Sequence, residues 1–380
     1  MLIIWRAPLK GARNFIHSSN LRQIFLEIPS CDHVYLKSRI RRLPMAETTR
    51  IQVHPMTLMD SYGRKINYLR LSVTDRCNFR CLYCMPEEGV PKVRHREILN
   101  YEEMLLLARS VVPLGIEKIR VTGGEPLVRN GILDFLKKLA DIPGLRQLVL
   151  TTNGYLLEEM AVQLREAGVQ RLNISLDSLT PDNFCAITRG GDLNKVLRGI
   201  QSAEAAGFPI KINVVAMRGI NDHEFLDFAA LTLEKRYSVR FIEYMPTFGE
   251  DSWKSRVISG EEILSRIGER FPMQPVVRGE MAGPSRDYRI SGAAGTIGVI
   301  TPLSGHFCRE CNRIRVTSQG MVKNCLFADN EFDLKPVLRE GNVESLQDVL
   351  RRIVNEKPGK HLMSETETAH RPFAMSKVGG

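Results

Sequence analysis

The sequence contains no long hydrophobic run. None of its apolar stretches approaches the roughly 18 consecutive residues that a membrane-spanning helix needs, so we expect a soluble protein without a membrane span. The 380 residues are 43% hydrophobic and 25% charged, which is typical of a globular protein. Such a chain is long enough for a barrel of roughly 250 residues and a smaller appended unit.

The eight cysteines lack the pairing pattern of a disulfide framework. Six of them form two groups of three, and the other two, Cys31 and Cys185, stand apart. Three neighbouring thiols cannot all pair with one another, whereas they can share a metal site. The pattern therefore favours metal binding in a reducing compartment. The first triad consists of Cys77, Cys81 and Cys84, and the second triad of Cys308, Cys311 and Cys325.

Both triads also lack a fourth cysteine. A metal site closed by protein alone usually has four ligands, in structural zinc sites and in iron–sulfur clusters alike. If each triad binds a four-iron, four-sulfur (4Fe-4S) cluster, one iron stays open to a small molecule, which indicates chemistry and not a structural role. The alternative is a zinc site at either triad, with His95 or His306 as the fourth ligand.

Acidic residues are absent from the first 25 residues. Residues 1–50 contain nine Lys and Arg against three acids, so most of the formal net charge of +10 belongs to this segment. A basic, amphipathic, acid-poor N-terminus is typical of an organellar presequence. We therefore expect residues 1–50 to be a presequence outside the fold and the protein to reside in the mitochondrial matrix. A disordered basic tail is the alternative.

From residue 68 onward, a strand and then a helix alternate at intervals of roughly 25–35 residues. Six such units predict an α/β fold with a parallel sheet. Glycines and polar residues follow the expected strands, as at Gly123–Pro126 and Thr152–Gly154. Because reactive groups of βα barrels gather at the C-terminal strand ends, we expect a partial (βα)6 TIM-type barrel over residues 58–246. Residues 247–380 are expected to form a smaller cluster-binding domain. The expected strands are Tyr68–Val73, Lys118–Thr122, Gln147–Thr151, Arg171–Leu176, Lys211–Met217 and Val239–Glu243.

Four cations, Arg70, Arg120, Lys211 and Arg240, lie on or beside the expected strands. Buried charge is costly unless it is paired. Several cations at one barrel mouth would suit a polyanion such as a nucleotide triphosphate. The alternative is that each cation pairs with a carboxylate or faces solvent, and Arg240 is the strongest candidate for such a structural role.

Taken in order, the motifs resemble the GTP 3',8-cyclase family of radical S-adenosylmethionine (SAM) enzymes. The C-x-x-x-C-x-x-C spacing of the first triad, with Tyr83 before the last cysteine, resembles the whole superfamily. The other motifs narrow the resemblance, which extends from Leu58 to the final Gly379–Gly380. Val378 departs from the more usual Ile, and the N-terminal extension is absent from bacterial members. The narrowing motifs are Lys118–Pro126, Leu150–Gly154, Asn173–Asp177, Arg240–Pro246 and the second triad with Asn312–Arg315.

This resemblance implies a role for each matching residue. The first triad would hold the 4Fe-4S cluster that engages SAM, and the second triad would hold another 4Fe-4S cluster. The implied catalytic residues are Cys77, Cys81, Cys84, Arg313, Arg315, Gly379 and Gly380. The implied SAM contacts are Tyr83, Gly124, Glu125, Ser175 and Met245. The implied GTP contacts are Arg70, Arg120, Thr151, Lys211, Arg313 and Arg315.

The resemblance also implies a reaction in molybdenum cofactor biosynthesis. A 5'-deoxyadenosyl radical from SAM would remove the ribose 3' hydrogen of GTP, and C3' would then bond to C8 of guanine. The implied partners are GTP, an electron donor protein and a downstream cyclic pyranopterin monophosphate synthase, with no nucleic acid; a homodimer is compatible with the sequence. Two alternatives remain: a radical SAM enzyme that modifies a peptide, and a zinc protein that binds nucleic acid through its basic N-terminus.

Overall fold

The computed structural model describes residues 57–379, apart from residues 92, 248–252, 278, 280–282, 362 and 364–372. Residues 53–380 group into one compact unit. The expected presequence and Gly380 lie outside the described residues. No helix of the described part is long and apolar enough to cross a membrane.

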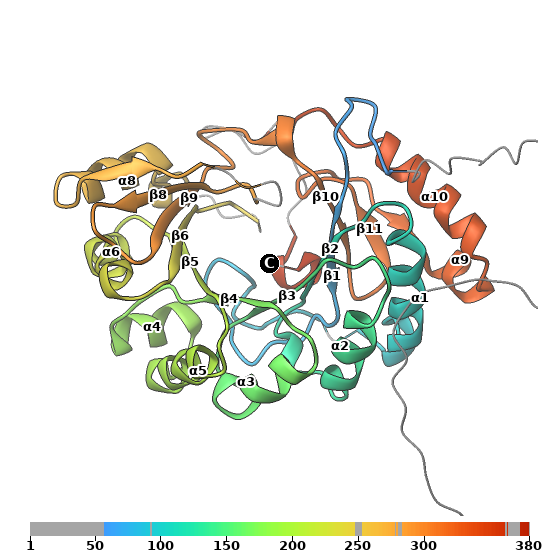
Figure 1. Ribbon diagram of the computed structural model, residues 1–380, viewed down its shortest axis with the longest axis horizontal. Helices are drawn as coiled ribbons and strands as arrows, with labels where there is room; N and C mark the ends of the chain where they lie inside the picture. Colours follow the sequence, from blue (N-terminus) through green and yellow to red (C-terminus); the bar gives the residue numbers. More distant parts are fainter. Residues whose placement is uncertain are drawn as a thin grey trace, which may run out of the picture. The chain divides into compact units, whose positions relative to one another are not determined.

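A curved parallel sheet forms the frame of this unit, with its helices on the outside (Figure 1). Its first six strands occur where the sequence predicts them, and each pairs in parallel with the next. They are β1 (Tyr68–Ser72), β2 (Lys118–Thr122), β3 (Gln147–Thr152), β4 (Arg171–Ser175), β5 (Ile210–Ala216) and β6 (Ser238–Glu243). The expected α/β barrel architecture is therefore confirmed.

The C-terminal part of the chain extends this sheet at both edges. Strand β9 (Thr296–Ile300) pairs in parallel with β6, and β10 (Arg313–Val316) pairs in parallel with β1. Antiparallel strands complete each side: β8 (Arg286–Ile290) and β7 (Met273–Pro275) beyond β9, and β11 (Met321–Lys323) and β12 (Phe332–Asp333) beyond β10. The expected division at residue 246 stays a prediction about sequence organisation, because both parts share one sheet.

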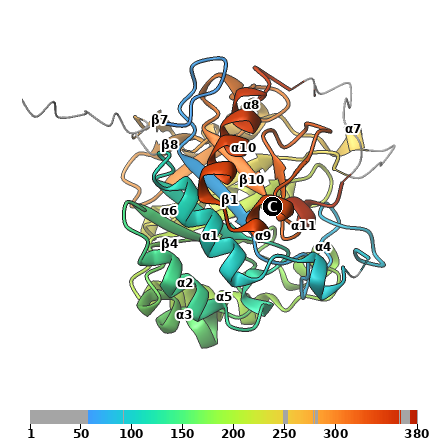
Figure 2. The same cartoon turned by 90° about the vertical axis from the view of Figure 1, so that its right-hand side faces the viewer.

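Helices α1–α6 and α8–α10 cover the outer face of the sheet, and their apolar sides join its outward-facing residues in one hydrophobic core. Figure 2 shows α1, α9 and α10 on the side of β1 and β10. The helices are α1 (Tyr101–Val111), α2 (Ile132–Ala140), α3 (Leu157–Glu166), α4 (Pro181–Thr188), α5 (Leu193–Ala205), α6 (Phe225–Glu234), α7 (Trp253–Arg256), α8 (Gly260–Gly268), α9 (Lys335–Glu340), α10 (Val343–Asn355) and α11 (Met375–Val378).

Helix α1 shows why these elements form where they do. Asn100 precedes it and its side chain accepts a hydrogen bond from the Glu103 amide at 2.7 Å, while the Glu103 carboxylate accepts from the Asn100 amide at 2.8 Å. This reciprocal capping satisfies two amides that the first helical turn leaves without partners. The apolar residues Met104, Leu107 and Val111 then follow at helical spacing and are fully buried.

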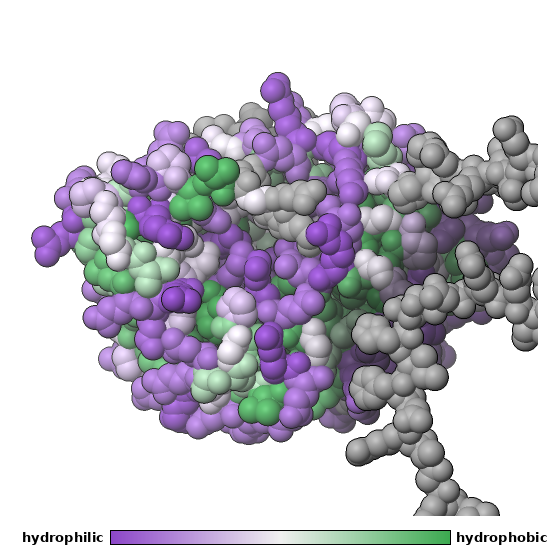
Figure 3. All heavy atoms as spheres, viewed as in Figure 1, coloured by the Kyte–Doolittle hydropathy of each residue, from purple (hydrophilic) through white to green (hydrophobic). Residues whose placement is uncertain are grey.

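Strand β1 divides its side chains between two environments. Leu69 and Leu71 point outward and are fully buried in the core, whereas Tyr68 and Arg70 line a cavity on the inner side. Successive side chains of a strand point to opposite faces, so this alternation places polar groups inside the barrel. On the face of the molecule seen in Figure 3, hydrophilic side chains predominate and hydrophobic ones form small patches.

Candidate active site

One cavity of about 250 Å³ lies inside the curved sheet, and all six triad cysteines line it. The loop glycines Gly123 and Gly124, together with Ser175 and Met245, also face this cavity. The structure therefore brings both triads and most of the predicted SAM contacts to one shared space, as expected from the strand ends.

The first triad lies on the loop after β1, and the C-terminal end of α4 holds that loop. The amides of Arg80 and Leu82 donate to the carbonyls of Thr188 and Ile187 at 3.1 and 3.0 Å. Arg189 donates to the carbonyls of Arg80 and Met85 at 3.0 and 3.1 Å. Its backbone has a φ of 55°, which is uncommon for a residue other than glycine. The cysteine loop is therefore fixed on both sides of Cys81.

Acidic side chains lie close to the first triad. Burial and then Glu125 raise the pKa of Cys77 to about 11, and burial followed by Asp177 raises the pKa of Cys81. Burial and Cys77 raise the pKa of Cys84 to about 12. These thiols are poor thiolates in the absence of a cation, because both the low dielectric and the acidic neighbours oppose a negative charge.

Gly124 and Glu125 serve the cysteine loop more directly than the sequence suggested. A Cβ at Gly124 would lie 2.2 Å from the Arg76 carbonyl oxygen, so the glycine permits two loops to touch. The Glu125 carboxylate accepts hydrogen bonds from the Thr152 hydroxyl at 2.8 Å and from the Asn153 amide at 2.7 Å. The protein's own donors, which include the Leu127 amide at 3.0 Å, hold the Glu125 carboxylate in place, and its expected contact with SAM stays a prediction.

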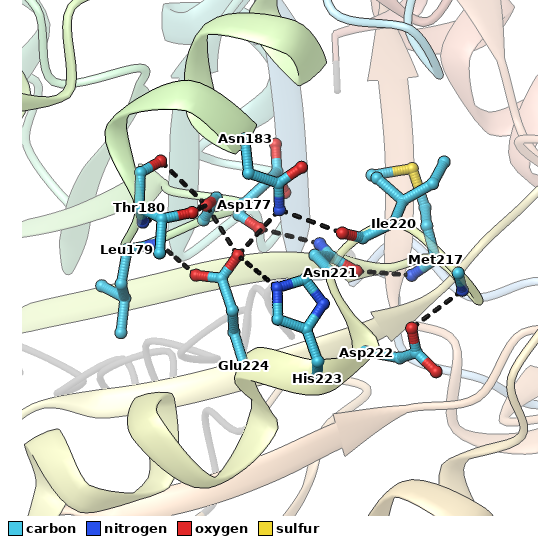
Figure 4. A network of polar contacts seen from close by, with 12 residues as sticks. Asp177, Leu179, Thr180, Asn183, Met217, Ile220, Asn221, Asp222, His223 and Glu224 are labelled. Atoms are coloured by element: carbon cyan, nitrogen blue, oxygen red, sulfur yellow. Dashed lines mark hydrogen bonds and ion pairs between the residues drawn. The ribbon is translucent and has the colours of Figure 1, made fainter.

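A polar network fixes the loops after β4 and β5 (Figure 4). The Asn221 amide group donates to the carbonyls of Asp177 and Val215 at 2.8 and 2.9 Å. The Asp177 carboxylate accepts from the Val215 amide and from the Tyr83 hydroxyl, both at 2.8 Å. Tyr83, a predicted SAM contact, is thereby held between the cysteine loop and this network, and it also faces the cavity.

The second triad has the opposite electrostatic setting. It lies on the short helix η4 (Cys308–Glu310), the turn before β10 and the segment after β11. Burial alone would raise the pKa of Cys311, but Arg313 and Lys357 outweigh it and lower the pKa to about 6. An Arg313 guanidinium nitrogen lies 3.6 Å from the Cys311 sulfur. Cys311 is therefore ready to bind a metal at neutral pH.

The distances between the cysteine sulfurs indicate whether each triad suits one metal ion or a larger cluster. Among the described residues, the group whose three ligand atoms all lie within 4.8 Å of one another is His306, Cys308 and His361. Neither cysteine triad meets this spacing, which a tetrahedral zinc ion would require. Each triad fits a larger group that separates its ligands, such as a 4Fe-4S cluster. The side chain of His95, the other zinc candidate, lies outside the described part.

Three arginines stand side by side on neighbouring strands. Arg70 on β1 is in register with Arg315 on β10 and with Arg120 on β2. Burial and then Arg315 and Arg120 lower the pKa of Arg70, while burial and Arg313 lower the pKa of Arg315 to about 10. Like charges directly opposite one another destabilise a sheet. A bound polyanion would remove this repulsion.

A second row of polar residues crosses strands β3, β4 and β5. Thr151, Asn173 and Lys211 are in register on β3, β4 and β5. Burial, followed by Arg240 and Arg171, lowers the pKa of Lys211 to about 6. Lys211 lies beside the cavity without lining it. Arg240 forms an ion pair with Asp287 at 2.9 Å, which agrees with the structural role expected for it.

Several buried polar atoms around the cavity have no hydrogen-bond partner among the described residues. They are the Tyr68 hydroxyl, the Arg120 Nε, the Thr151 hydroxyl and the side-chain nitrogen of Asn173. Orphaned buried groups cost roughly 1–3 kcal/mol each unless a ligand or water satisfies them. Together with the arginine row, they fit a polar, anionic ligand in this cavity.

The C-terminal tail connects the surroundings of the two triads. The Met375 amide donates to the Cys84 carbonyl at 3.0 Å. The Gly379 carbonyl accepts from Arg70 at 2.7 Å and from Arg315 at 3.3 Å. Gly379 is buried with a φ of 76°, and the C-terminal mark lies inside the row of strands in Figure 1. The tail therefore enters the site.

Two protein-family models match the chain, Radical SAM superfamily over residues 71–232 and Molybdenum Cofactor Synthesis C over residues 237–363. A GTP 3',8-cyclase from Geobacter sulfurreducens is 61% identical over 326 residues, which cover 86% of this chain and 100% of that protein. The chain belongs to the GTP 3',8-cyclase family. A GTP 3',8-cyclase from Alkaliphilus oremlandii is 46% identical over 327 residues, which cover 85% of this chain and 100% of that protein.

The solved structures add the fold of this family member. SuiB from Streptococcus suis bound to S-adenosylmethionine superposes with a TM-score of 0.53 at 12% identity, covering 76% of this chain and 69% of that chain. At this identity the similarity concerns the fold alone. The expected radical SAM fold is confirmed by this similarity and by the family model.

Sequence reasoning missed several residues that line the GTP 3',8-cyclase cavity or contact its lining residues. Tyr68 lies two residues before Arg70, and Asn173 begins the motif that contains Ser175. Their positions on β1 and β4, in register with neighbouring strands, could have identified both. Lys118 stacks over the Tyr68 ring at 4.7 Å, and burial followed by Arg120 lowers its pKa to about 7. Lys357 lies far from any motif, and no local signal marks it.

Proposed function

We propose that this cavity is the active site of a radical SAM GTP 3',8-cyclase. The enzyme converts GTP to (8S)-3',8-cyclo-7,8-dihydroguanosine 5'-triphosphate, the first step of molybdenum cofactor biosynthesis. The observation that carries the proposal is that two cysteine triads, each without a fourth cysteine, and a row of three arginines face one cavity. Family membership supports the same reaction.

The first triad would hold the 4Fe-4S cluster that engages SAM, and the second would hold a 4Fe-4S cluster beside GTP. When bound and given one electron by a donor protein, the first cluster and SAM would supply radical chemistry for removing the ribose 3' hydrogen of GTP. Tyr83, Gly124, Ser175 and Met245 line the part of the cavity that SAM would occupy. Gly124 acts mainly by letting two loops approach.

The chain's own residues position and enclose the substrate. Arg70, Arg120 and Arg315 would bind phosphate oxygens, for which a guanidinium offers paired donors. Thr151 and Arg313 would contact the nucleoside, since the Thr151 hydroxyl is buried with no protein partner among the described residues. Lys211 would regain its proton beside a triphosphate, because an anion favours the charged form of an amine. Gly379 closes the space between Arg70 and Arg315, to which its carbonyl is hydrogen-bonded.

An anaerobic assay tests the proposed reaction. Protein reconstituted with iron and sulfide is mixed with SAM, dithionite and GTP, and the nucleotides are separated by mass and chromatography. The expected result is consumption of GTP with formation of 5'-deoxyadenosine and a cyclised triphosphate. Deoxyadenosine formation that does not respond to GTP, or zinc in place of iron, would contradict the proposal. A peptide-modifying enzyme would leave GTP intact.

Two partner proposals extend this function. An electron donor protein would supply the electron, and a cyclic pyranopterin monophosphate synthase would use the product. Coupled assays test the second proposal, because the cyclised product should be consumed only when that synthase is present.

We also propose that the protein forms a homodimer. Measurement of the molecular mass of the reconstituted protein in solution tests this, and a mass of one chain would contradict it.

We also propose that this is a mitochondrial form of the family. The proposal rests on the basic, acid-poor composition of residues 1–50. Fusion of residues 1–50 to a fluorescent protein in eukaryotic cells tests it. Matrix fluorescence is the expected result, and a diffuse signal would contradict it.

A further inference from the structure

Lys357 connects the two stretches of chain that carry Cys311 and Cys325. It follows helix α10 and is only 3% exposed. Its ammonium group donates to the Arg313 carbonyl at 3.0 Å and makes a short contact with the Asn324 carbonyl. Arg313 lies two residues after Cys311, and Asn324 directly precedes Cys325. One side chain therefore sets the separation of two triad cysteines.

The segment that begins at Lys357 also holds the third cysteine. Arg64 donates to the Cys308 carbonyl at 2.8 Å and to the carbonyls of Pro358 and Gly359 at 2.7 and 3.1 Å. The backbone on both sides of the second triad is thus fastened to residues 357–359.

The charge of Lys357 has no acidic partner in the described part of the chain. Its ammonium group donates there to two backbone carbonyls, and a buried ammonium is costly unless something negative lies near. Burial lowers the pKa of Lys357, while Cys311 and Cys325 act in the opposite direction. Lys357 lines the same cavity as Cys311 and Cys325, so a cluster held by the second triad would be the negative group beside this cation.

We propose that Lys357 is a positioning residue of the second cluster. Its two hydrogen bonds hold Cys311 and Cys325 at the separation that the cluster needs, and its charge makes the cluster easier to reduce. Nearby positive charge stabilises the added electron, since cluster potentials follow net charge and hydrogen bonding. The inference rests on the proposed two-cluster function.

The test uses a protein in which Cys77, Cys81 and Cys84 are all replaced by Ala, so that only the second cluster forms. Lys357→Met, Lys357→Arg and the exposed control Lys360→Met are compared in this background. Iron retention against a chelator and the midpoint potential of the cluster are measured, neither of which requires GTP or turnover. We expect Lys357→Met to weaken iron retention about 10- to 100-fold, the usual effect of losing a group that orients metal ligands.

The remaining cluster in Lys357→Met should titrate at a more negative potential, while Lys357→Arg should recover part of both effects and Lys360→Met should match the parent. A Lys357→Met protein with the parent's iron retention and potential would overturn the proposal. A general folding failure is recognised in the six-cysteine protein: if Lys357→Met there loses iron equally from both triads, the specific role is also refuted. A parent protein without iron would instead refute the proposed second cluster itself.

Discussion

The two triads share a cavity but differ in the charge that surrounds them. Glu125 and Asp177 lie near the first triad, and its three thiols have raised pKa values. Arg313 and Lys357 lie near the second triad and lower the pKa of Cys311 to about 6. Since a cluster near acids is harder to reduce than one near cations, the same ligand set can serve two purposes. The first site suits a strong reductant, and the second suits an anchor for an anionic substrate.

Removal of a cysteine should separate the two roles and gives the largest expected effect. Cys81→Ala should reduce 5'-deoxyadenosine formation by more than about 100-fold, because even changes outside the ligand shell cost about 10- to 100-fold. Cys325→Ala should keep SAM cleavage by dithionite while losing the cyclised product. Both are measured by chromatography of the same reaction. Equal loss of SAM cleavage in the two variants would break the comparison.

Arg120→Met should lower the affinity for GTP in the region between the triads without disturbing either cluster. A hydrogen bond to a charged group contributes about 1.5–3 kcal/mol, so GTP affinity should fall roughly 10- to 150-fold. Equilibrium binding of GTP under anaerobic conditions measures this change. Arg146→Met, at an exposed surface ion pair, serves as the control. Unchanged GTP affinity in Arg120→Met would contradict the proposed role of the arginine row in binding GTP.

Thiol alkylation of the cluster-free protein should distinguish the triads by pH. Above pH 6 Cys311 is mostly thiolate, so its rate with iodoacetamide should level off, whereas the rate at Cys77 should keep rising toward its pKa of about 11. At pH 7 Cys311 should react at least about tenfold faster, even though a low-pKa thiolate is intrinsically less nucleophilic. Peptide mass spectrometry gives both rates. Parallel pH profiles for the two cysteines would contradict the charge difference.

The smallest expected effect concerns the tail that joins the two regions. In Gly379→Ala the new Cβ would lie 2.5 Å from a Thr122 methyl carbon, at a backbone φ of 76° that favours glycine. We expect cyclised product to fall about fivefold, equivalent to about 1 kcal/mol, with SAM cleavage retained. Gly341→Ala has a similar φ of 72° but open space around it, so it controls for backbone strain alone. Equal effects of the two variants would argue against the tail contact.

The sequence predicted the part of the fold that repeats locally. The six strands β1 to β6 follow from alternating strand and helix patterns, and the triads follow from their spacing. The parallel pairing of β10 with β1 and of β9 with β6 joins residues more than 50 positions apart, some more than 200 apart, and no periodicity records such pairing. The sequence therefore gives no sign that residues after 246 add strands to the same sheet, and the expected domain division stays a prediction.

Site residues that belong to a sequence motif could be predicted, whereas those that reach the site only through contacts in the folded chain could not. Gly124 lines the cavity, and only the folded chain shows that its missing Cβ also lets two loops touch. The contact of Glu125 with an ammonium group stays a prediction, and only the structure shows that Thr152 and Asn153 donate to its carboxylate. Lys357 reaches the second triad from 32 residues beyond Cys325, and only the folded chain reveals it.

The most direct test is a redox titration of the two clusters in the reconstituted protein, without SAM or GTP, followed by electron paramagnetic resonance. Variants that retain one triad assign each signal to its site. The charge difference predicts that the first cluster is reduced at a more negative potential than the second. Equal potentials, or a first cluster that is easier to reduce, would contradict the account.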